Sequence, residues 1–412
     1  MFSPIADIEE TRVGPLPSQE IGCSSRSPRD VYLVVIGATG RVGSRVLELI
    51  ATQQDRWREA GLNPLLIALA NSQRTLVEAD GIDAAHAIER LRAAAPGRQD
   101  AAQLAEWVLR SSQRPLIVLD CTASADVAAC YPTWLVAGID IVTPNKLGPS
   151  ADNPLATAIS AAQIASGACL YDATTVGAQL PLLSTLRELR RAGDRVERFE
   201  AVLSGTLSYV LGRVQQGDAL SAAVRGAVAE GYAEPHPARD LSGEDAARKL
   251  VILLRALGHE LDLADVDCVP LVDAEILAEP DPAQLLQRLA GADEIWRARA
   301  AVAQARRERW IYRVSFDAGS GGPANGSHRR ARIAPERVAL DHPLANLAPC
   351  ENKLVLHSAF YRAAPLTVAG PGAGIDLTAA GVLGDLHAAL QRHAPLPVRK
   401  SGTHEEILEV AA

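Results

Sequence analysis

The sequence predicts an α/β fold, in which a Rossmann-type, doubly wound parallel sheet is followed by a second domain of α+β type. Three observations lead to this prediction. Short apolar runs alternate with helical stretches in the first part of the chain, a glycine-rich turn follows the first of these runs, and strand-like segments replace the alternation after about residue 167. The 412 residues suffice for two domains, each with its own core.

The first domain is expected to span residues 31–166, after a tail over residues 1–30 that is rich in Ser, Pro and Gly. Its strands are predicted from apolar runs, the first of which ends in glycine, with helical stretches between them; the runs cover 31–37, 64–72, 115–123 and 139–146. Such alternation requires right-handed crossovers and hence a parallel sheet. A glycine-rich segment and a last helix over 376–390 are expected to return to this domain, so that about 370–412 complete it.

The second domain is expected to span residues 167–369 and to be richer in strands. A strand over 169–177 precedes a helix that Pro181 opens and Gly193 closes. The remaining segments are a strand, turn and helix over 198–214, a long helix over 243–257, two strands over 307–317 and 329–340 joined by a flexible hairpin loop, and two strands over 353–361 and 365–374.

Composition and charge exclude several classes of protein. The net charge is −8 and the Arg pairs are scattered, so no basic stripe for nucleic acid is visible. The six cysteines form no C-x-x-C pair, which favours small buried thiols in a reducing cytosol. No apolar run reaches the ~18 residues of a membrane helix, and the acidic "DIEE" near the N-terminus is unlike a signal peptide. We therefore expect a cytoplasmic protein.

A phosphate-binding loop is predicted at "VVIGATGRVGS". Its glycines follow the first strand and open a helix, where free backbone N–H groups and the helix dipole favour a pyrophosphate. The alternative is a tight structural turn. The residues expected to contact a dinucleotide are Gly37, Thr39, Gly40, Arg41, Val42 and Gly43.

The end of the second strand indicates which dinucleotide binds. An NAD enzyme usually has Asp or Glu there, to hold the ribose 2′-hydroxyl. This chain has Ser72 and Arg74 in "ALANSQR" and no acid. An arginine would attract a 2′-phosphate, so NADP is favoured, with NAD as a further possibility. The alternative is that Arg74 is simply exposed to solvent.

The helix over 243–257 has charges that its apolar surroundings do not explain. Asp245 and Lys249 lie four residues apart in a segment that is otherwise mostly Ala, Leu, Val and Ile. They could form an ordinary ion pair, and Ser242 with Asp245 could form a capping box. A lysine on a buried helix is also suited to proton transfer. From these residues alone, structural and catalytic roles remain open.

Five stretches in order along residues 31–390 resemble homoserine dehydrogenase. They are "VTPNK", "LYDATTVGAQLP", "LSGTLSYV", "EGYAEPHPARDLSGEDAARKL" and "VAGPGAGIDLTAAGVLGDL". The chain looks similar to the dehydrogenase part of bacterial bifunctional aspartokinase/homoserine dehydrogenase, without the kinase. The resemblance implies reversible, NAD(P)-dependent interconversion of L-homoserine and L-aspartate 4-semialdehyde, a step in threonine, methionine and isoleucine biosynthesis.

The resemblance also implies roles for individual residues. Lys249 would exchange a proton with the substrate oxygen, and Lys146 would be the second lysine of the site, in contact with both substrate and cofactor. Substrate would lie among three carboxylates: Glu234, Asp240 and Asp245, of which Asp245 also counts as catalytic. Thr122, Gly231 and Gly370 match further cofactor contacts.

The resemblance further implies a monovalent cation, Na⁺ or K⁺, and a homodimer joined through the second domain. The cation ligands would be Asp172, Val176, Ala178 and Leu180. The chain departs from the family pattern by an extra residue near Thr175, by Gln179 in place of glycine and by His236 in place of Asp. These departures support an alternative, a catalytically impaired NADP-binding homologue that acts as a sensor or partner protein.

Overall fold

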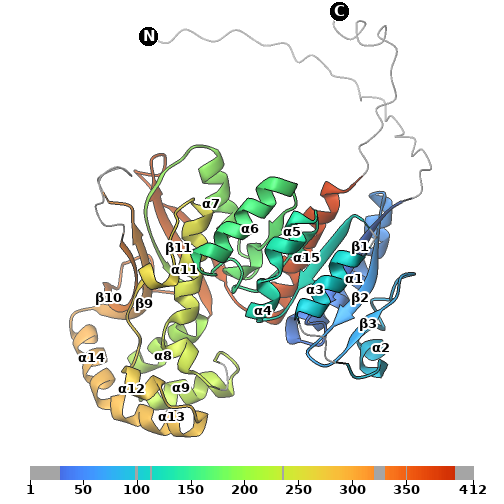
Figure 1. The fold of residues 1–412 in the computed structure, drawn as a ribbon. Coiled ribbons are helices and arrows are strands. Elements are labelled where there is room, and N and C mark those ends of the chain that lie inside the picture. Colours follow the sequence, from blue (N-terminus) through green and yellow to red (C-terminus); the bar gives the residue numbers. More distant parts are fainter. Residues whose placement is uncertain are drawn as a thin grey trace, which may run out of the picture.

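Two six-stranded sheets organise the molecule into two halves, as Figure 1 shows for this computed structural model. The structure describes residues 28–97, 101–111, 114–233, 236–319, 330–348 and 350–394. Most of the predicted tail and the tip of the predicted hairpin loop lie outside these ranges, as does Glu234. We call the half built on the first sheet the parallel half and the other the antiparallel half.

The parallel half has the strand order β3-β2-β1-β4-β5-β6. Its strands are β1 (Arg29–Ile36), β2 (Leu62–Ala70), β3 (Thr75–Val77), β4 (Leu116–Asp120), β5 (Asp140–Val142) and β6 (Leu170–Tyr171). All neighbours pair in parallel except β3, an antiparallel edge strand that was not predicted. The four predicted strands of this sheet are confirmed; β4 and β5 are shorter than predicted, and β1 and β2 begin two residues earlier.

Helices cover both faces of this sheet. They are α1 (Arg41–Glu59), α2 (Ala87–Ala93), α3 (Ala101–Arg110), α4 (Ala125–Ala128), α5 (Tyr131–Val136) and α6 (Asn153–Ser166). Buried side chains of β1, β2 and β4 alternate between two clusters, one on each face of the sheet. This two-faced burial explains why the strands are continuous apolar runs.

The last helix returns to the parallel half, as the sequence predicted. Helix α15 (Ile375–Arg392) lies beside α1 in Figure 1, and Val382 and Leu386 are buried in the same cluster as β1. The two helices are also joined by polar contacts: Trp57 Nε1 donates to His387 Nδ1 over 3.3 Å, and Arg45 pairs with Asp376 at 2.7 Å. Residues from the end of the chain therefore complete the first core.

The antiparallel half has the strand order β12-β11-β7-β9-β10-β8. Its strands are β7 (Val196–Val202), β8 (Asp267–Cys268), β9 (Glu308–Asp317), β10 (Arg330–Ala339), β11 (Glu351–Ser358) and β12 (Leu366–Pro371). β9 and β10 pair antiparallel along ten residues each, which confirms the predicted hairpin arms. Only β8 pairs in parallel, with β10.

Helices pack on one face of this second sheet and complete its main core. They are α7 (Leu182–Arg191), α8 (Gly205–Gln215), α9 (Leu220–Ala229), α10 (Ala238–Leu241), α11 (Glu244–Ala256), α12 (Ala274–Leu277), α13 (Pro282–Arg288) and α14 (Asp293–Ala305), with 3₁₀ turns η1 (Ala173–Thr175), η2 (Leu263–Asp265) and η3 (Leu289–Ala292). Helix α11 confirms the predicted long helix. Within the described ranges, every helix is too short or too polar to cross a membrane.

The strand predicted over 169–177 is wrong beyond Tyr171. The chain turns into the 3₁₀ helix η1 because Thr175 donates both its backbone N–H and its hydroxyl to the Asp172 carbonyl, at 3.0 and 2.7 Å. The cysteines also differ from the prediction. The five in the described part of the chain are partly rather than fully buried.

Candidate active site

The N-terminal end of α11 faces the loop that follows β5. A left-handed glycine, Gly243 (φ +80°), precedes the helix, and a Cβ there would lie 2.0 Å from the Tyr312 hydroxyl. The predicted capping box does not form: Ser242 accepts from the Glu244 N–H, and the structure gives α11 no side-chain cap. The Asp245 carboxylate is therefore free to point away from its own backbone.

Asp245 joins two lysines that come from different halves of the molecule. Its Oδ2 lies 2.9 Å from Lys249 Nζ, and its Oδ1 lies 3.2 Å from Lys146 Nζ. Burial alone would raise the pKa of the Asp245 carboxyl, but the two ammonium groups outweigh it and hold that pKa well below its usual range. Lys249 Nζ also donates to the Leu203 carbonyl at 2.7 Å. The predicted i,i+4 ion pair is thus present as part of a larger cluster.

Lys146 is held in place by its neighbour Asn145, which the sequence reading had not singled out. The Asn145 amide donates to Asp120 Oδ2 and to the Ser124 carbonyl, each at 3.0 Å, and its oxygen accepts from the Leu147 N–H. Asp120 is fully buried at the end of β4. The chain on both sides of Lys146 is therefore fixed to the first sheet. Polar residues directly after apolar strands were the available signal for this arrangement.

A buried network completes the support of this loop. The Tyr131 hydroxyl donates to Asp120 Oδ2 at 2.5 Å, and Thr143 Oγ1 donates to the Asp120 carbonyl at 2.8 Å. Burial, followed by the charge of Asp120, raises the pKa of Tyr131 well above its ordinary value. The phenol therefore stays protonated and acts as a donor. Gly148 lies against the same ring, because a Cβ there would approach it to 2.5 Å.

Of the two other predicted substrate carboxylates, only that of Asp240 lies in the described part of the chain. Asp240 lies on α10, and its Oδ1 is 3.3 Å from the hydroxyl of Thr206 at the start of α8. Glu234 falls outside the described residues. His236 directs Nε2 at the carbonyls of Glu279 and Pro280, both at 3.2 Å, as a loop histidine would.

The predicted phosphate loop is a tight strand-to-helix turn. A Cβ on Gly37 (φ +77°) would lie 2.8 Å from the Cys121 carbonyl oxygen, and one on Gly43 would lie 2.2 Å from the Gly37 carbonyl oxygen. Gly40 precedes α1, whose first turn holds no acidic side chain. The backbone can therefore approach a phosphate at the start of a long helix without meeting a negative charge. The glycines can therefore serve a tight structural turn and a phosphate-binding loop at the same time.

Ser72 and Arg74 line an open hollow of about 760 Å³ beside this loop, together with Gln73, Pro96 and Gly97. The turn after β2 is shaped by Asn71, whose oxygen accepts from the backbone N–H groups of Gln73 and Arg74, at 2.8 Å each. The Asn71 amide also donates to Thr39 in the glycine loop at 3.1 Å. Arg74 contacts the Ala94 carbonyl. Asn71 thus connects the two predicted cofactor segments.

The remaining predicted cofactor residues are dispersed. Thr122 lies beside the glycine loop, since its methyl group would be 3.0 Å from a Cβ on Gly37. Gly370 lies on β12 next to Leu180. Gly231 follows α9, and the neighbouring Tyr232 carbonyl accepts from Thr206. The structure therefore places Thr122 with the phosphate loop, and Gly370 and Gly231 with the antiparallel half.

The predicted cation loop carries a guanidinium that was not foreseen. Asp172, only 5% exposed, binds Arg187 through Oδ1 at 2.5 Å. Burial and, next, the Asp172 carboxylate raise the pKa of the nearby Asp385 to about 7. Asp385 Oδ2 accepts from the Ala173 N–H at 3.0 Å. In the part of the chain that the structure describes, no three His, Cys, Asp or Glu side chains form a metal-binding group.

The backbone of this loop is strained but leaves carbonyl oxygens available. Ala178 has a φ of +53°, which a residue with a Cβ rarely adopts. The Leu180 carbonyl accepts from the Leu182 N–H at 2.7 Å, and a carbonyl oxygen has two lone pairs. Gln179 points to solvent, so its replacement of the family's glycine causes no clash.

Comparisons with known proteins cover both halves of the chain. A family model described as homoserine dehydrogenase matches residues 181–387, and one described as the homoserine dehydrogenase NAD binding domain matches residues 39–172. The homoserine dehydrogenase of Emericella nidulans is 34% identical over 380 residues, covering 88% of this chain and 99% of that protein. A hyperthermophilic archaeal homoserine dehydrogenase solved with NADPH has the same fold, with a TM-score of 0.64, 21% identity, and 88% and 98% of the two chains covered.

Bifunctional relatives are longer. The bifunctional aspartokinase/homoserine dehydrogenase 2 of Escherichia coli is 34% identical over 388 residues, which are 92% of this chain and 46% of that protein. The chain thus spans less than half the length of the first curated relatives that it matches. Both the family models and the full-length match to the fungal enzyme lead to one assignment. The chain belongs to the homoserine dehydrogenase family.

Proposed function

We propose that this chain catalyses the reversible, NAD(P)-dependent interconversion of L-homoserine and L-aspartate 4-semialdehyde. The observation that carries the proposal is the cluster in which Asp245 binds both Lys146 and Lys249. The cluster lies where α11 of the antiparallel half meets the β5 loop of the parallel half. It therefore faces both the half that would hold the cofactor and the half that would hold the substrate.

The proposed role of Lys249 is proton transfer. NADPH, when bound, supplies the hydride that reduces the aldehyde carbon. The aldehyde oxygen then gains negative charge, and Lys249 Nζ donates the proton that converts it to the hydroxyl. An ammonium group has three N–H bonds; two are directed at Asp245 and the Leu203 carbonyl, which leaves one for the substrate. In the oxidising direction the same nitrogen takes the proton back.

The carboxylates are proposed to bind the amino end of the substrate. Asp240 lies near the end of α10, and Asp245 lies in the first turn of the next helix, α11, where it binds both lysines. Lys146 is proposed to orient the substrate oxygen and to contact the cofactor, because Asn145 fixes its backbone to the first sheet. Glu234 remains part of the proposal on the resemblance alone.

We propose NADP as the preferred cofactor, with NAD as a poorer one. The phosphate loop from Gly37 to Gly43 and Thr122 would hold the pyrophosphate, and the hollow beside Ser72 and Arg74 would receive the 2′-phosphate. The described residues that line this hollow include a guanidinium and no carboxylate, which is the charge that a phosphate requires. Residues 31–166, completed by 370–412, would then form the cofactor domain, and residues 167–369 the substrate domain.

A monovalent cation at the loop after β6 also belongs to the proposal. The carbonyl oxygens of Val176, Ala178 and Leu180 are suitable ligands for a hard cation, and Arg187 binds only one oxygen of Asp172. Because that guanidinium repels a cation, we expect weak binding and activity that rises from salt-free buffer to moderate NaCl or KCl. Arg187→Gln should lower the salt concentration needed. Activity that stays flat in both proteins would contradict the cation.

Two chains are proposed to associate through the second domain. Light scattering on the purified protein should then give about twice the 43.6 kDa of one chain. A mass of one chain at micromolar concentration would contradict the dimer.

The function is tested with purified protein, L-aspartate 4-semialdehyde and NADPH. We expect loss of the nicotinamide absorbance that depends on the aldehyde, and its return with homoserine and NADP⁺. NADPH binding by fluorescence without consumption would instead identify the non-catalytic homologue. If the protein neither binds nor consumes NADPH, both interpretations are contradicted.

A further inference from the structure

A second charged hollow lies between the two halves, near the C-terminal end of α11. Its volume is about 460 Å³, within the range of small-molecule sites. Its walls come from α6 and β6 on one side and from α7 and α11 on the other. None of Lys146, Asp245 and Lys249 lines it. The hollow is therefore separate from the candidate active site.

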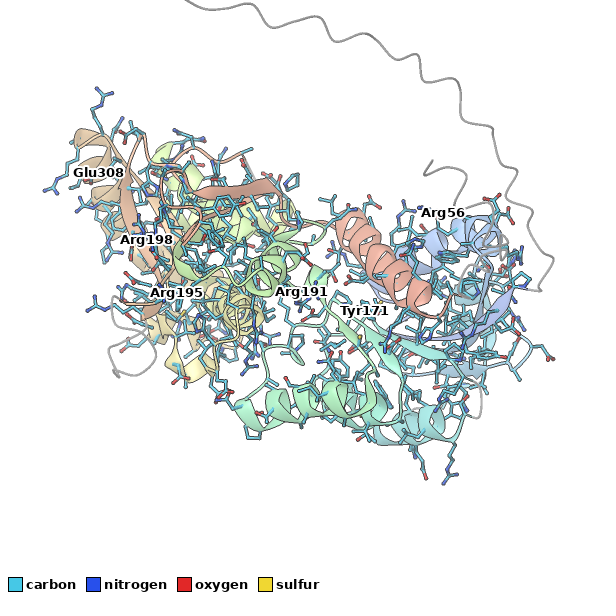
Figure 2. All side chains as sticks on the ribbon, turned by 90° about the horizontal axis from the view of Figure 1, so that it is seen from above. Arg56, Tyr171, Arg191, Arg195, Arg198 and Glu308 are labelled. Atoms are coloured by element: carbon cyan, nitrogen blue, oxygen red, sulfur yellow. The ribbon has the colours of Figure 1, made fainter. Side chains whose placement is uncertain are left out.

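Arginines dominate the charge of this hollow. Among the described residues that line it are four arginines, Arg187, Arg190, Arg191 and Arg255, and one carboxylate, Asp172. Figure 2 labels Arg191 in the middle of the molecule, where the two halves meet. A site with this excess of guanidinium groups attracts a small molecule with more than one negative charge.

The ion pairs of these arginines do not cancel the excess. Arg187 pairs with Asp172, and Arg255 pairs with Asp262 at 3.1 Å. Arg191 pairs with Glu188, but both side chains are about 70% exposed, so the pair is weak. No ion pair joins Arg190 to a carboxylate in the described part of the chain, and its side chain is exposed.

Favourable interaction with the helix dipole explains only part of this arrangement. Arg190 and Arg191 lie in the last turn of α7, where cations are favoured. Arg255, however, comes from a different helix, and the opposite wall offers neutral donors from Ser160 and Gln163. Gln163 Oε1 already accepts from the Leu170 N–H at 2.8 Å, so its amide NH₂ group remains as a donor.

The hollow is connected to the loop that holds Lys146. Arg255 Nη1 donates to the Pro149 carbonyl at 3.0 Å. One residue further on, the Ser150 hydroxyl donates to the Lys146 carbonyl at 2.7 Å and accepts from Arg248 at 3.2 Å. An anion that binds Arg255 competes with the Pro149 carbonyl for the same guanidinium. Its binding therefore acts on the segment that positions Lys146.

We propose that this hollow binds a small multivalent anion, of the di- or tricarboxylate or phosphate-ester class, and that its occupancy changes the rate of the reaction. The binding part of the proposal stands on the hollow alone. The effect on rate rests on the proposed function, so binding and rate are measured separately.

The binding test compares three proteins by thermal unfolding in citrate or inorganic phosphate at fixed ionic strength. The proteins are the unchanged chain, Arg190→Gln/Arg191→Gln, and the matched control Arg306→Gln/Arg307→Gln. The control pair is also adjacent, exposed and located at a helix C-terminus, but on α14. All three proteins keep Arg74, so any binding of the same anion at the cofactor hollow is common to them.

We expect citrate to raise the unfolding temperature of the unchanged chain and of the control protein Arg306→Gln/Arg307→Gln to the same extent. In Arg190→Gln/Arg191→Gln the apparent affinity for citrate should be at least tenfold weaker. Ser160→Phe, which fills the hollow from the opposite wall, should weaken binding as well. Equal responses in all four proteins would overturn the site. Phosphate without citrate binding would identify the phosphate-ester class, and the reverse result would identify the carboxylate class.

The rate test uses the unchanged chain with saturating substrates and saturating citrate or phosphate. We expect kcat to change at least twofold, and the change to be absent in Arg190→Gln/Arg191→Gln. Binding that leaves kcat unchanged would overturn the regulatory part. If the chain shows no turnover at all, the proposed function fails, and the binding result still decides the site.

Discussion

The two halves of the molecule place their functional residues by different means. In the parallel half, the candidate cofactor residues follow directly after strands: Gly37 after β1, Ser72 and Arg74 after β2, and Thr122 after β4. In the antiparallel half, Asp245 and Lys249 lie on α11, a helix that is buried on nearly all sides. The first arrangement depends on strand ends that share one sheet edge. The second depends on a helix packed into a core.

This difference suggests that the two halves have separate tasks and that one residue, Asp245, takes part in both. The parallel half would bind the cofactor and the antiparallel half would transfer the proton. Asp245 belongs to both tasks, because it binds Lys249 of its own half and Lys146 of the other. Substitutions in each half should therefore affect different measurements, and a substitution of Asp245 should affect both.

The largest effect is expected for Lys249→Ala. Loss of the proton donor should lower kcat by about 10²–10⁴-fold, the usual contribution of a general acid. NADPH affinity should be nearly unchanged, because the glycine loop, Ser72, Arg74 and Thr122 lie on the other half. Steady-state kinetics and a fluorescence titration measure the two quantities.

Lys249→Arg is the matched control for this prediction. Arginine keeps the positive charge beside Asp245, but its guanidinium does not release a proton at neutral pH. Activity should therefore stay low in this variant too. Recovery of normal kcat in Lys249→Arg would show that residue 249 is only an ion-pair partner.

The next effect is expected for Asp245→Asn, which releases both lysines. A hydrogen bond to a charged group contributes about 1.5–3 kcal/mol, so kcat/KM should fall roughly tenfold to a hundredfold. The unchanged protein should also lose stability from this cluster in acid. The pKa of Asp245 is lowered in the folded state, so the contribution is present above the ordinary carboxyl pKa and is lost as pH falls below it.

Unfolding temperatures between pH 3 and pH 7 test the second part of this prediction. The destabilisation caused by Asp245→Asn should become smaller as the pH falls below about 4, because Asp245 in the unfolded chain of the unchanged protein is then protonated. A difference that is constant over this range would mean that the two ion pairs do not stabilise the fold. The helix itself should persist, because Asp245 does not cap it.

A smaller effect is expected for Arg74→Glu in the parallel half. NADPH affinity should fall roughly tenfold through loss of a charge-assisted contact with the 2′-phosphate. NADH affinity and kcat with NADH should be retained. Arg56→Glu, an exposed position on the same half in Figure 2, is the matched control. Equal weakening of both cofactors would show that Arg74 does not contact the 2′-phosphate.

The smallest effect is expected for Asp385→Asn, on the helix that returns to the parallel half. Burial and Asp172 raise the pKa of Asp385 to about 7. The folded state then holds a proton that the unfolded state has released, so stability falls as pH rises from about 4 to about 7. Asparagine cannot ionise and removes this dependence.

The unfolding free energy of Asp385→Asn, relative to the unchanged chain, should therefore rise by about 1–3 kcal/mol from pH 4 to pH 8. Asp376→Asn is the control, because Asp376 lies on the same helix and its side chain is 81% exposed. A parallel pH dependence in the two variants would contradict the raised pKa of Asp385.

Much of the architecture could be predicted because it depends on local patterns. The four main strands of the parallel sheet, the glycine loop and the long helix α11 all appear in the sequence as apolar periodicity or turn residues. The ion pair between Asp245 and Lys249 follows from helical spacing. The roles assigned to Lys146 and Lys249 came from the resemblance, and they remain proposals.

Other features depend on residues distant in the sequence. The Asp120 network with Tyr131 and Asn145 has no periodicity that marks it. The end of β6 at Tyr171 depends on hydrogen bonds from Thr175, and the ion pair of Asp172 depends on how α7 packs. The edge strand β3 is too short to show a pattern.

The sequence by itself determined most of the segments that form strands and helices, the glycine-rich turn at which we propose that a phosphate binds, and the lysine beside a carboxylate on a buried helix. These properties are set by neighbours within a few residues. Only the tertiary structure decided that Asp245 reaches Lys146 as well as Lys249, and that arginines of α7 and α11 line one hollow. These contacts join residues that are far apart in the sequence, so they depend on how the helices and the two halves pack together.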